Sequence, residues 1–424
     1  MEGPLRGVRV LDLTRIVAGP YGTQYLADLG AEVVKVERPG GEEARAMEPS
    51  ERGQSHYFLA VNHGKEGIVV DLRHPEGRRV LLDLARACDV VVENFRPGVT
   101  ARLGIDYEAI RQVRPDVVYC SISAFGQAGA WAQRSGFDVA VQAMSGLMSL
   151  TGEPGGDPVR MGLPMSDLVA GLNAVIGVSA ALFERERTGR GQHIDVALLD
   201  TSVNLLTQFA EWRWMTGEDP VAVGSGHPSL APYRAYPTSD GHVVIATFGE
   251  SFWPKVCRAL ELPDLVSDSR FTSNPQRVAN REELDAILAA ATRRRATAEW
   301  DRILTEHDVP HAPVNGVGEA LANPLLAARG AITETDDPVL GRRPALGRAL
   351  TLSAHPNGPV EPAPLLGADT DEVLRRLCGY GEEEIARLRE RGAVGGGSMA
   401  ADAGTGGPGT ATDAPHRGGA GGAG

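Results

Sequence analysis

The first two hundred residues alternate short apolar runs with segments that carry helix signals. Pro20 and Pro75 each suit the first turn of a helix, and Gly30 suits the end of the helix that begins near Pro20. Near-continuous apolar strands separated by helices are typical of a parallel sheet that is covered on both faces. We therefore predict a large, open α/β domain whose ligand binds at the carboxyl ends of the strands. The predicted strands are at 8–13, 33–36, 68–70, 89–92 and 117–120.

The next part of the chain has a longer stretch with a helical pattern of apolar residues. Apolar residues at helical intervals predict one long helix at 167–187, ended by Gly189. A strand at 192–196 and a helix at about 198–215 follow it.

The pattern changes again near residue 225. Two β-like runs, at 233–237 and 242–247, flank the turn residues 239–241 and predict a hairpin. Helical patterns then follow at 251–260, 280–292 and 297–306.

These patterns divide the chain into five parts. The last part is rich in glycine and almost without large apolar side chains, so it cannot offset its ordering entropy. We expect a large α/β domain at 1–200, a linker at 201–224, a smaller α+β domain at 225–320, a return segment packing on the large domain at 321–391, and a disordered tail at 392–424.

Composition narrows the classes of function. The 424 residues include 42 Lys and Arg against 55 Asp and Glu, a net charge of −13, which argues against nucleic acid as a partner. No apolar run approaches the roughly 18 residues of a membrane span, and no signal segment opens the chain, so we expect no membrane partner. The four cysteines form no CxxC pair and there is no HExxH, so we expect a cytoplasmic protein without a metal site.

Two groups of residues suggest an anionic ligand. Gly19 and Pro20 follow the first predicted strand, where backbone N–H groups would suit an anion, although a plain structural turn has the same sequence. Basic residues also recur near the strand ends, and a parallel sheet would bring several of them to one crevice for a phosphorylated ligand. The alternative is that most are solvated surface charges. These residues are Arg15, Arg38, Lys65, Arg73, Arg96 and Arg102.

Asp167 stands at the start of the predicted long helix, where two interpretations remain open. A carboxylate there is commonly an N-cap or first-turn residue, favoured by the helix dipole. The same setting would keep a nucleophilic carboxylate ionised. The Gly-Ser-Gly-His-Pro run at 224–228 is likewise either a linker or a mobile lid.

Several ordered segments together resemble the class III (CaiB/BaiF-type) CoA-transferases, which include formyl-CoA:oxalate and carnitine CoA-transferases and the related α-methylacyl-CoA racemases. The likeness extends from about Arg6 to Leu388. It rests on residues 11–20, 26–37, 93–98 with 102–104, 188–192 and 364–367.

The resemblance implies a Rossmann-like CoA-binding domain, a smaller domain and an interlocked homodimer. It implies that Asp167 is the catalytic carboxylate, which forms an acyl-aspartyl anhydride as CoA passes from an acyl-CoA to a small carboxylic acid. The CoA thioester is then a substrate, and no tightly bound cofactor is expected. Positions matching CoA contacts of the family are Arg15, Ile16, Val17, Ala18, Arg38, Val70, Arg73, Asn94, Phe95, Arg102 and, as the aromatic of that region, Phe137.

Two rival functions follow from the same residues. The racemases of this family resemble one another in a His-Asp pair, and the matching pair here is Phe137-Asp138. Because phenylalanine cannot transfer a proton, one arm of that chemistry is missing. The other rival is a non-catalytic CoA-binding protein, which would not need Asp167.

Overall fold

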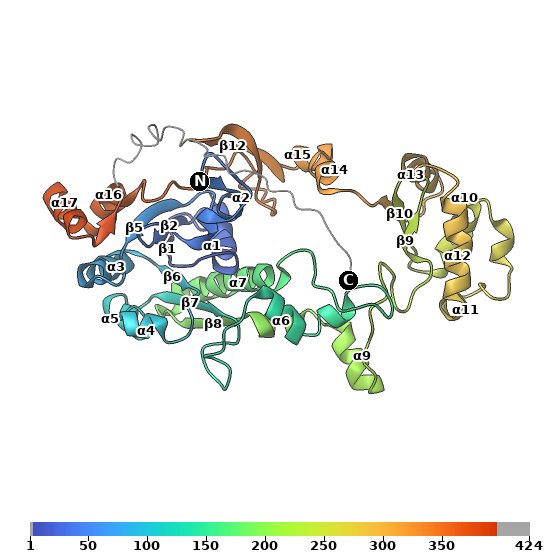
Figure 1. Ribbon diagram of the computed structural model, residues 1–424, viewed down its shortest axis with the longest axis horizontal. Coiled ribbons are helices and arrows are strands. Elements are labelled where there is room, and N and C mark those ends of the chain that lie inside the picture. Colours follow the sequence, from blue (N-terminus) through green and yellow to red (C-terminus); the bar gives the residue numbers. More distant parts are fainter. Residues whose placement is uncertain (1–2, 397–424) are drawn as a thin grey trace, which may run out of the picture.

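A computed structural model describes residues 3–396 (Figure 1). A seven-stranded sheet forms the centre of the large body, in the order β14-β5-β2-β1-β6-β7-β8. Six strands are parallel neighbours, and β14 at one edge is antiparallel to β5. This confirms the predicted open α/β fold. The strands are β1 (Arg9–Asp12), β2 (Glu32–Glu37), β5 (Glu66–Val70), β6 (Val90–Glu93), β7 (Val118–Ser123), β8 (His193–Ala197) and β14 (Val394–Gly395).

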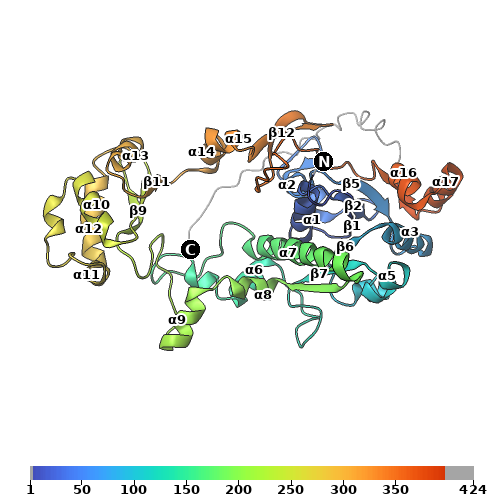
Figure 2. The same cartoon turned by 180° about the vertical axis from the view of Figure 1, so that it is seen from behind.

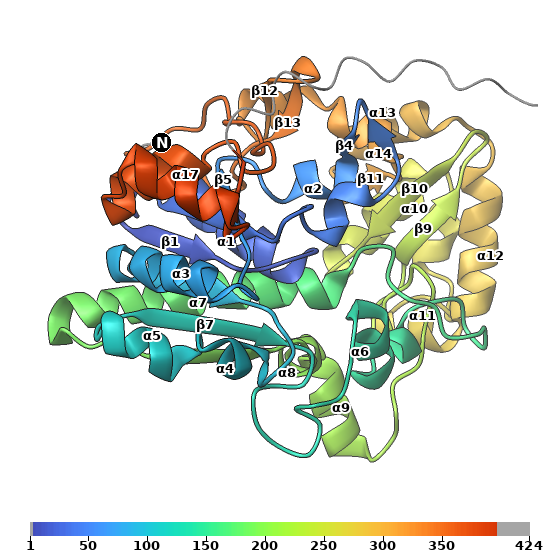
Figure 3. The ribbon, with the colours of Figure 1, turned by 60° about the vertical axis from the view of Figure 1, so that its left-hand side comes forward.

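Helices cover both faces of this sheet (Figure 3). On one face, α1 (Ala18–Asp28) and α7 (Met165–Thr188) pack on alternate strand residues such as Val10 and Val92. On the other, α3 (Pro75–Ala87), α5 (Tyr107–Val113) and α17 (Glu382–Glu390) close a second apolar layer around Leu11 and Val91. The sheet needs both layers because its strands are apolar on both sides.

The long helix α7 runs from Met165 to Thr188 and ends at Gly189, whose φ of 68° is left-handed. Its length and mean hydropathy of 1.6 would also suit a membrane span. Here it packs against α1, α8 (Leu198–Asn204) and the sheet, as the core helix of a domain does.

The small body lies apart from the large one, and two connecting segments join them (Figures 1 and 2). Its sheet has the order β11-β10-β9, with β9 (Tyr233–Pro237) and β10 (His242–Ala246) forming the predicted hairpin. The buried indoles of Trp253 and Trp300 lie in its core. Its other elements are β11 (His311–Pro313), α10 (Trp253–Ala259), α11 (Asn274–Ala279), α12 (Arg281–Thr292) and α13 (Thr297–Glu306).

Shorter elements complete the described chain. A two-stranded sheet of β12 (Ile332–Asp337) and β13 (Gly341–Leu346) follows the second connecting segment. The remaining short strands and helices are β3 (Ser50–Glu51), β4 (Gln54–Ser55), α2 (His56–Ala60), α4 (Val99–Leu103), α6 (Asp138–Met144), α9 (Gln208–Thr216), α14 (Val317–Leu321), α15 (Pro324–Ala328) and α16 (Thr370–Val373).

Two expectations are corrected. The single helix predicted at about 198–215 is split into α8 and α9, because Thr207 has a φ of 41° that no α-helix tolerates. The tail predicted from residue 392 begins too early. Ala393 is buried and Val394 pairs with Val70 as part of β14, so apolar burial continues past the start of the glycine-rich stretch. Residues 397–424 of that predicted tail lie outside the described residues.

Candidate active site

The turn between β1 and α1 lies at the middle of the large sheet, because β1 is its central strand. Asn94, which directly follows β6, holds this turn with both ends of its amide. Its Oδ1 accepts from the Arg15 N–H at 2.9 Å, and its Nδ2 donates to the Arg15 carbonyl at 2.8 Å. The turn therefore has a fixed shape set by a neighbouring strand.

Ile16 lies in the left-handed region, with a φ of 70°. This conformation is an outlier for a β-branched residue and persists only where the surroundings enforce it. Glu42 provides one such restraint, because its Oε2 accepts from the Ile16 N–H at 2.7 Å. Strain of this kind is common where a backbone must present itself to a ligand.

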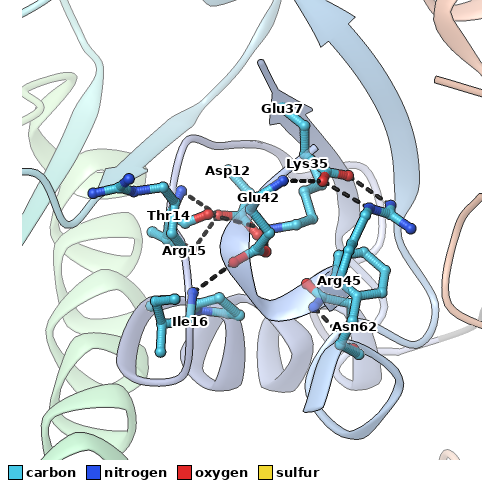
Figure 4. A network of polar contacts seen from close by, with 12 residues as sticks. Asp12, Thr14, Arg15, Ile16, Lys35, Glu37, Glu42, Arg45 and Asn62 are labelled. Carbon is cyan, nitrogen blue, oxygen red and sulfur yellow. Dashed lines mark hydrogen bonds and ion pairs between the residues drawn. The ribbon is translucent and has the colours of Figure 1, made fainter. Parts of the chain in front are cut away.

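A buried network of charges lies beside this turn and supports it (Figure 4). Lys65 Nζ lies 3.0 Å from Asp12 Oδ2, and Lys35 Nζ lies 2.7 Å from Glu42 Oε1. Burial by itself would raise the pKa of Asp12, but Lys65 and Lys35 hold it well below its usual range. Lys35 also donates to the Thr14 carbonyl at 3.0 Å. The charges thus tie the turn to β2 and β5.

A cavity of about 130 Å³ lies beyond the turn, and we call it the Asp167 cavity. The carboxyl ends of β1, β6 and β7 meet the N-terminus of α7 there. Phe137 is 76% exposed and contributes an aromatic ring to the wall. The lining is Arg15, Ile16, Val17, Ala18, Asn94, Ile122, Ser123, Ala124, Gly136, Phe137, Asp167 and Leu198.

Asp167 lies in the first turn of α7, but it does not cap the helix. The N-cap position is Pro164, which has no side-chain acceptor. Asp138 replaces it, since its Oδ1 accepts from the Ser166 N–H at 2.8 Å while its Oδ2 accepts from Gln142 Nε2 at 2.7 Å. The Asp167 carboxylate is thereby left available for a ligand.

The environment of Asp167 changes its acidity. Burial, and then the negative charge of Asp138, raises the pKa of Asp167 to about 7. A carboxylate with a raised pKa is more basic and so a better nucleophile once it is ionised. Such shifts are frequent at catalytic carboxylates.

A larger cavity of about 520 Å³ adjoins the first, and Arg15 lines both. We call it the arginine cavity. Arg38 and Arg73 line it, as do Val70 and Phe95. Glu43 orients two of the three guanidinium groups, at 3.2 Å from both Arg15 Nη1 and Arg38 Nη2. Three arginines beside an apolar wall suit a ligand with phosphate groups and an apolar part.

The sequence comparisons identify the family. Residues 5–370 match the model of CoA-transferase family III. The chain belongs to that family. It is 40% identical to the succinyl-CoA:glutarate CoA-transferase of Mus musculus, over 92% of this chain and 90% of that protein. It is 37% identical to the succinate–glutarate CoA-transferase of Agrobacterium fabrum, over 88% of this chain and 96% of that protein.

The solved structures agree. A CaiB/BaiF family protein from Brucella suis matches with a TM-score of 0.81 and 37% identity, covering 89% of this chain and 100% of that one. The resemblance stated from the sequence motifs is confirmed, and the protein is a CoA-transferase.

Within this CoA-transferase, the expectation that several cations share one crevice is met by Arg15, Arg38 and Arg73. The prediction that Lys65 faces a ligand is wrong, because its side chain is buried against Asp12. Arg102 is exposed on α4 and lines neither cavity, and Arg96 donates to Ser135.

The 224–228 segment is held by the rest of the chain. Gly224 N–H donates to the Gly152 carbonyl at 2.8 Å, and Arg281 donates to the Pro228 carbonyl at 3.1 Å. It lines neither the Asp167 cavity nor the arginine cavity. The role of this segment as a lid stays a prediction.

Sequence reasoning missed Glu42, Ser123 and the capping role of Asp138. Glu42 and Ser123 stand in loops or strand ends without a motif that marks them. Asp138 was noted only as half of a racemase pair, and nothing local links it to a helix that begins 27 residues later. Among residues 3–396, no group of three or more His, Cys, Asp or Glu side chains is placed to hold a metal ion.

Proposed function

We propose that this enzyme moves CoA from an acyl-CoA donor to a carboxylic acid acceptor through an acyl-aspartyl anhydride on Asp167. The observation that carries the proposal is the position of Asp167. It is a half-buried carboxylate with a raised pKa, in a small cavity that shares Arg15 with an arginine-lined cavity suited to CoA.

The proposed chemistry balances without an energy source. The Asp167 carboxylate attacks the thioester carbonyl, the carbon–sulfur bond breaks, and CoA leaves as its thiolate. The anhydride keeps the acyl group activated. The CoA thiolate attacks the aspartyl carbonyl of the anhydride, which releases the donor acid and leaves CoA on Asp167 as a thioester. The acceptor carboxylate attacks that thioester to form a second anhydride and free the thiolate, which then attacks the acceptor carbonyl, giving the new acyl-CoA and restoring the Asp167 carboxylate. Water must stay away from the anhydride, since its hydrolysis would lose the energy of the thioester.

The substrates are proposed to be short dicarboxylic acids and their CoA thioesters. The two relatives from Mus musculus and Agrobacterium fabrum are named for succinate or succinyl-CoA and for glutarate. The Asp167 cavity, at about 130 Å³, is of a size that suits a short acyl chain. CoA itself is a substrate in this scheme, and Arg38, Arg73, Val70 and Phe95 are proposed to contact it.

A homodimer is proposed as the working form. Leu172, Ile176 and Phe183 form an exposed apolar face on α7, and Trp214 and Met215 are exposed on α9. Apolar faces of this extent on a folded chain mark interaction surfaces. A second copy is the simplest partner that would cover them in a symmetric assembly.

The decisive variant is Asp167→Asn, which keeps the shape but removes the ionised oxygen. We expect loss of nearly all transfer of CoA from succinyl-CoA to glutarate, followed by mass, because an amide is a far weaker nucleophile. Hydroxylamine added during turnover should convert Asp167 of the wild-type protein into a hydroxamate. Full activity in the variant would contradict the proposal.

A separate measurement addresses the racemase rival. Phe137 offers no titratable group at the cavity wall, so we expect no deuterium uptake at the α-carbon of 2-methylacyl-CoA in deuterated water without acceptor acid. Rapid exchange under those conditions would support the rival instead.

A further inference from the structure

Ser123 is a buried hydroxyl without a partner beside the catalytic carboxylate. It is the last residue of β7, is 9% exposed and lines the Asp167 cavity. Its Oγ contacts no hydrogen-bonding group among residues 3–396. Buried polar atoms are nearly always paired, so an exception on a residue that lines a cavity requires a partner from outside the described chain, such as a ligand atom.

The other polar side chains around this cavity are occupied. Both ends of the Asn94 amide bond to the Arg15 backbone. The Asp138 carboxylate accepts from the Ser166 N–H and from Gln142, and the Ser166 Oγ accepts from Ser202. Ser123 therefore differs from its neighbours in having a free donor.

Arg15 supplies a second free donor. Its Nη1 pairs with Glu43 at 3.2 Å, but its buried Nε has no partner among the described residues. Arg15 is the one positively charged residue among the described residues that line the Asp167 cavity. A hydroxyl and a guanidinium N–H match the two acceptor oxygens of a carboxylate.

Charge balance points to the same ligand. A dicarboxylyl group brings a second negative charge into a cavity that already contains Asp167, and two buried like charges require a cation nearby. A monocarboxylyl group of equal length brings no such charge and would leave both donors unpaired.

We infer that Ser123 Oγ and Arg15 Nε bind the free carboxylate of a dicarboxylyl group while its thioester end lies against Asp167. This inference rests on the proposed function and extends it to the residues that select the acyl group. Ser123 is then a specificity-determining residue for dicarboxylic over monocarboxylic substrates.

The test compares two thioesters of the same length, succinyl-CoA and butyryl-CoA, which carry a carboxylate or a methyl group at the far end. With glutarate as acceptor, Ser123→Ala should lower the ratio of kcat/KM for succinyl-CoA to that for butyryl-CoA by about tenfold or more. Where butyryl-CoA turns over too slowly to measure, the inhibition constants of succinyl-CoA and butyryl-CoA give the same comparison. Ser123→Thr keeps a hydroxyl and should largely restore the ratio.

Ser121→Ala is the matched control, because Ser121 lies two residues earlier on β7 and its Oγ pairs with His193 Nε2 at 2.9 Å. That variant should leave the ratio as in the wild type. Thermal unfolding of each variant checks the fold. An unchanged ratio in Ser123→Ala, whether both substrates slow equally or neither does, would overturn the inference. Failure of the wild type to transfer CoA at all would instead overturn the proposed function.

Discussion

Asp167 illustrates how two carboxylates can take different roles at one helix terminus. Asp138 is fully used as a hydrogen-bond acceptor for Ser166 and Gln142, so it fixes the start of α7. Asp167 is left without that task and is influenced by the charge of Asp138. Burial and this charge together raise the pKa of Asp167 to about 7. The result is a carboxyl group that titrates near neutral pH and is more basic than a free aspartate.

The raised pKa predicts the pH dependence of transfer. Below pH 7 Asp167 becomes protonated and loses its nucleophilic form, so kcat/KM should fall about tenfold per pH unit on the acid side. Asp138→Asn removes the neighbouring charge but keeps an acceptor for the Ser166 N–H. Its acid limb should therefore move to lower pH, as measured by initial rates from pH 4 to 9.

Glu93 provides the control for this profile, because burial also raises its pKa to about 7. Glu93→Gln should keep the limb near pH 7 if Asp167 is responsible for it. A limb that disappears in Glu93→Gln and stays in place in Asp138→Asn would assign the titration to Glu93 instead.

At the scale of elements, buried charges fasten the β1–α1 turn to its neighbours. Lys65, which directly precedes β5, donates to Asp12, Thr23 and Asn62 and to the Pro20 carbonyl. One side chain thus links the end of β1 to the first turns of α1. Removing one partner of such a pair leaves an unpaired charge in the interior.

Lys65→Met should therefore destabilise the protein by about 3–5 kcal/mol in urea unfolding. The matched control is Arg79→Met, which breaks an exposed pair with Glu384 and should cost less than about 1 kcal/mol. Equal losses of unfolding free energy in the two variants would show that the buried Asp12–Lys65 pair stabilises the protein no more than an exposed pair does.

The edge strand β14 gives a second prediction at this scale. Ala393 and Val394 are buried, and the Ala393 carbonyl accepts from the Asp71 N–H at 2.9 Å. A chain ending at Arg391 should be less stable by about 2–4 kcal/mol than one ending at Gly396. Thermal and urea unfolding of the two truncated proteins measure the difference, and identical midpoints would refute a stabilising role for β14.

For the whole molecule, the arrangement of two bodies joined by separate segments leaves apolar helix faces uncovered (Figures 1 and 2). Ile176 on α7 is 66% exposed, a large cost for an aliphatic side chain in water. We expect light scattering to give the mass of two chains. Ile176→Asp should shift the protein toward one chain, because a buried aspartate would oppose association. A wild-type protein that is monomeric at all concentrations would contradict this.

Much of the fold was predictable from the chain. Six of the seven strands of the large sheet, α7 and the β9–β10 hairpin follow from apolar periodicity and turn residues, which are local properties. The parallel sheet predicted that several of the six basic residues would share one crevice, and Arg15, Arg38 and Arg73 do so, but it did not say which of the six. Lys65 was misplaced because its partner Asp12 lies 53 residues away. Likewise, the pairing of β14 with β5 joins segments more than 300 residues apart.

By itself, the amino-acid sequence determined the parallel architecture, the position of Asp167 at a helix start and the motifs that mark the family. These depend on neighbours within a few turns or on ordered motifs along the chain. Only the tertiary structure decided that Asp138 caps α7, that Ile16 is held in a strained conformation, and that Ser123 and Arg15 have donors without a partner among residues 3–396. Burial, acidity and the pairing of polar atoms are set by contacts across the fold, and local sequence does not encode which contacts form.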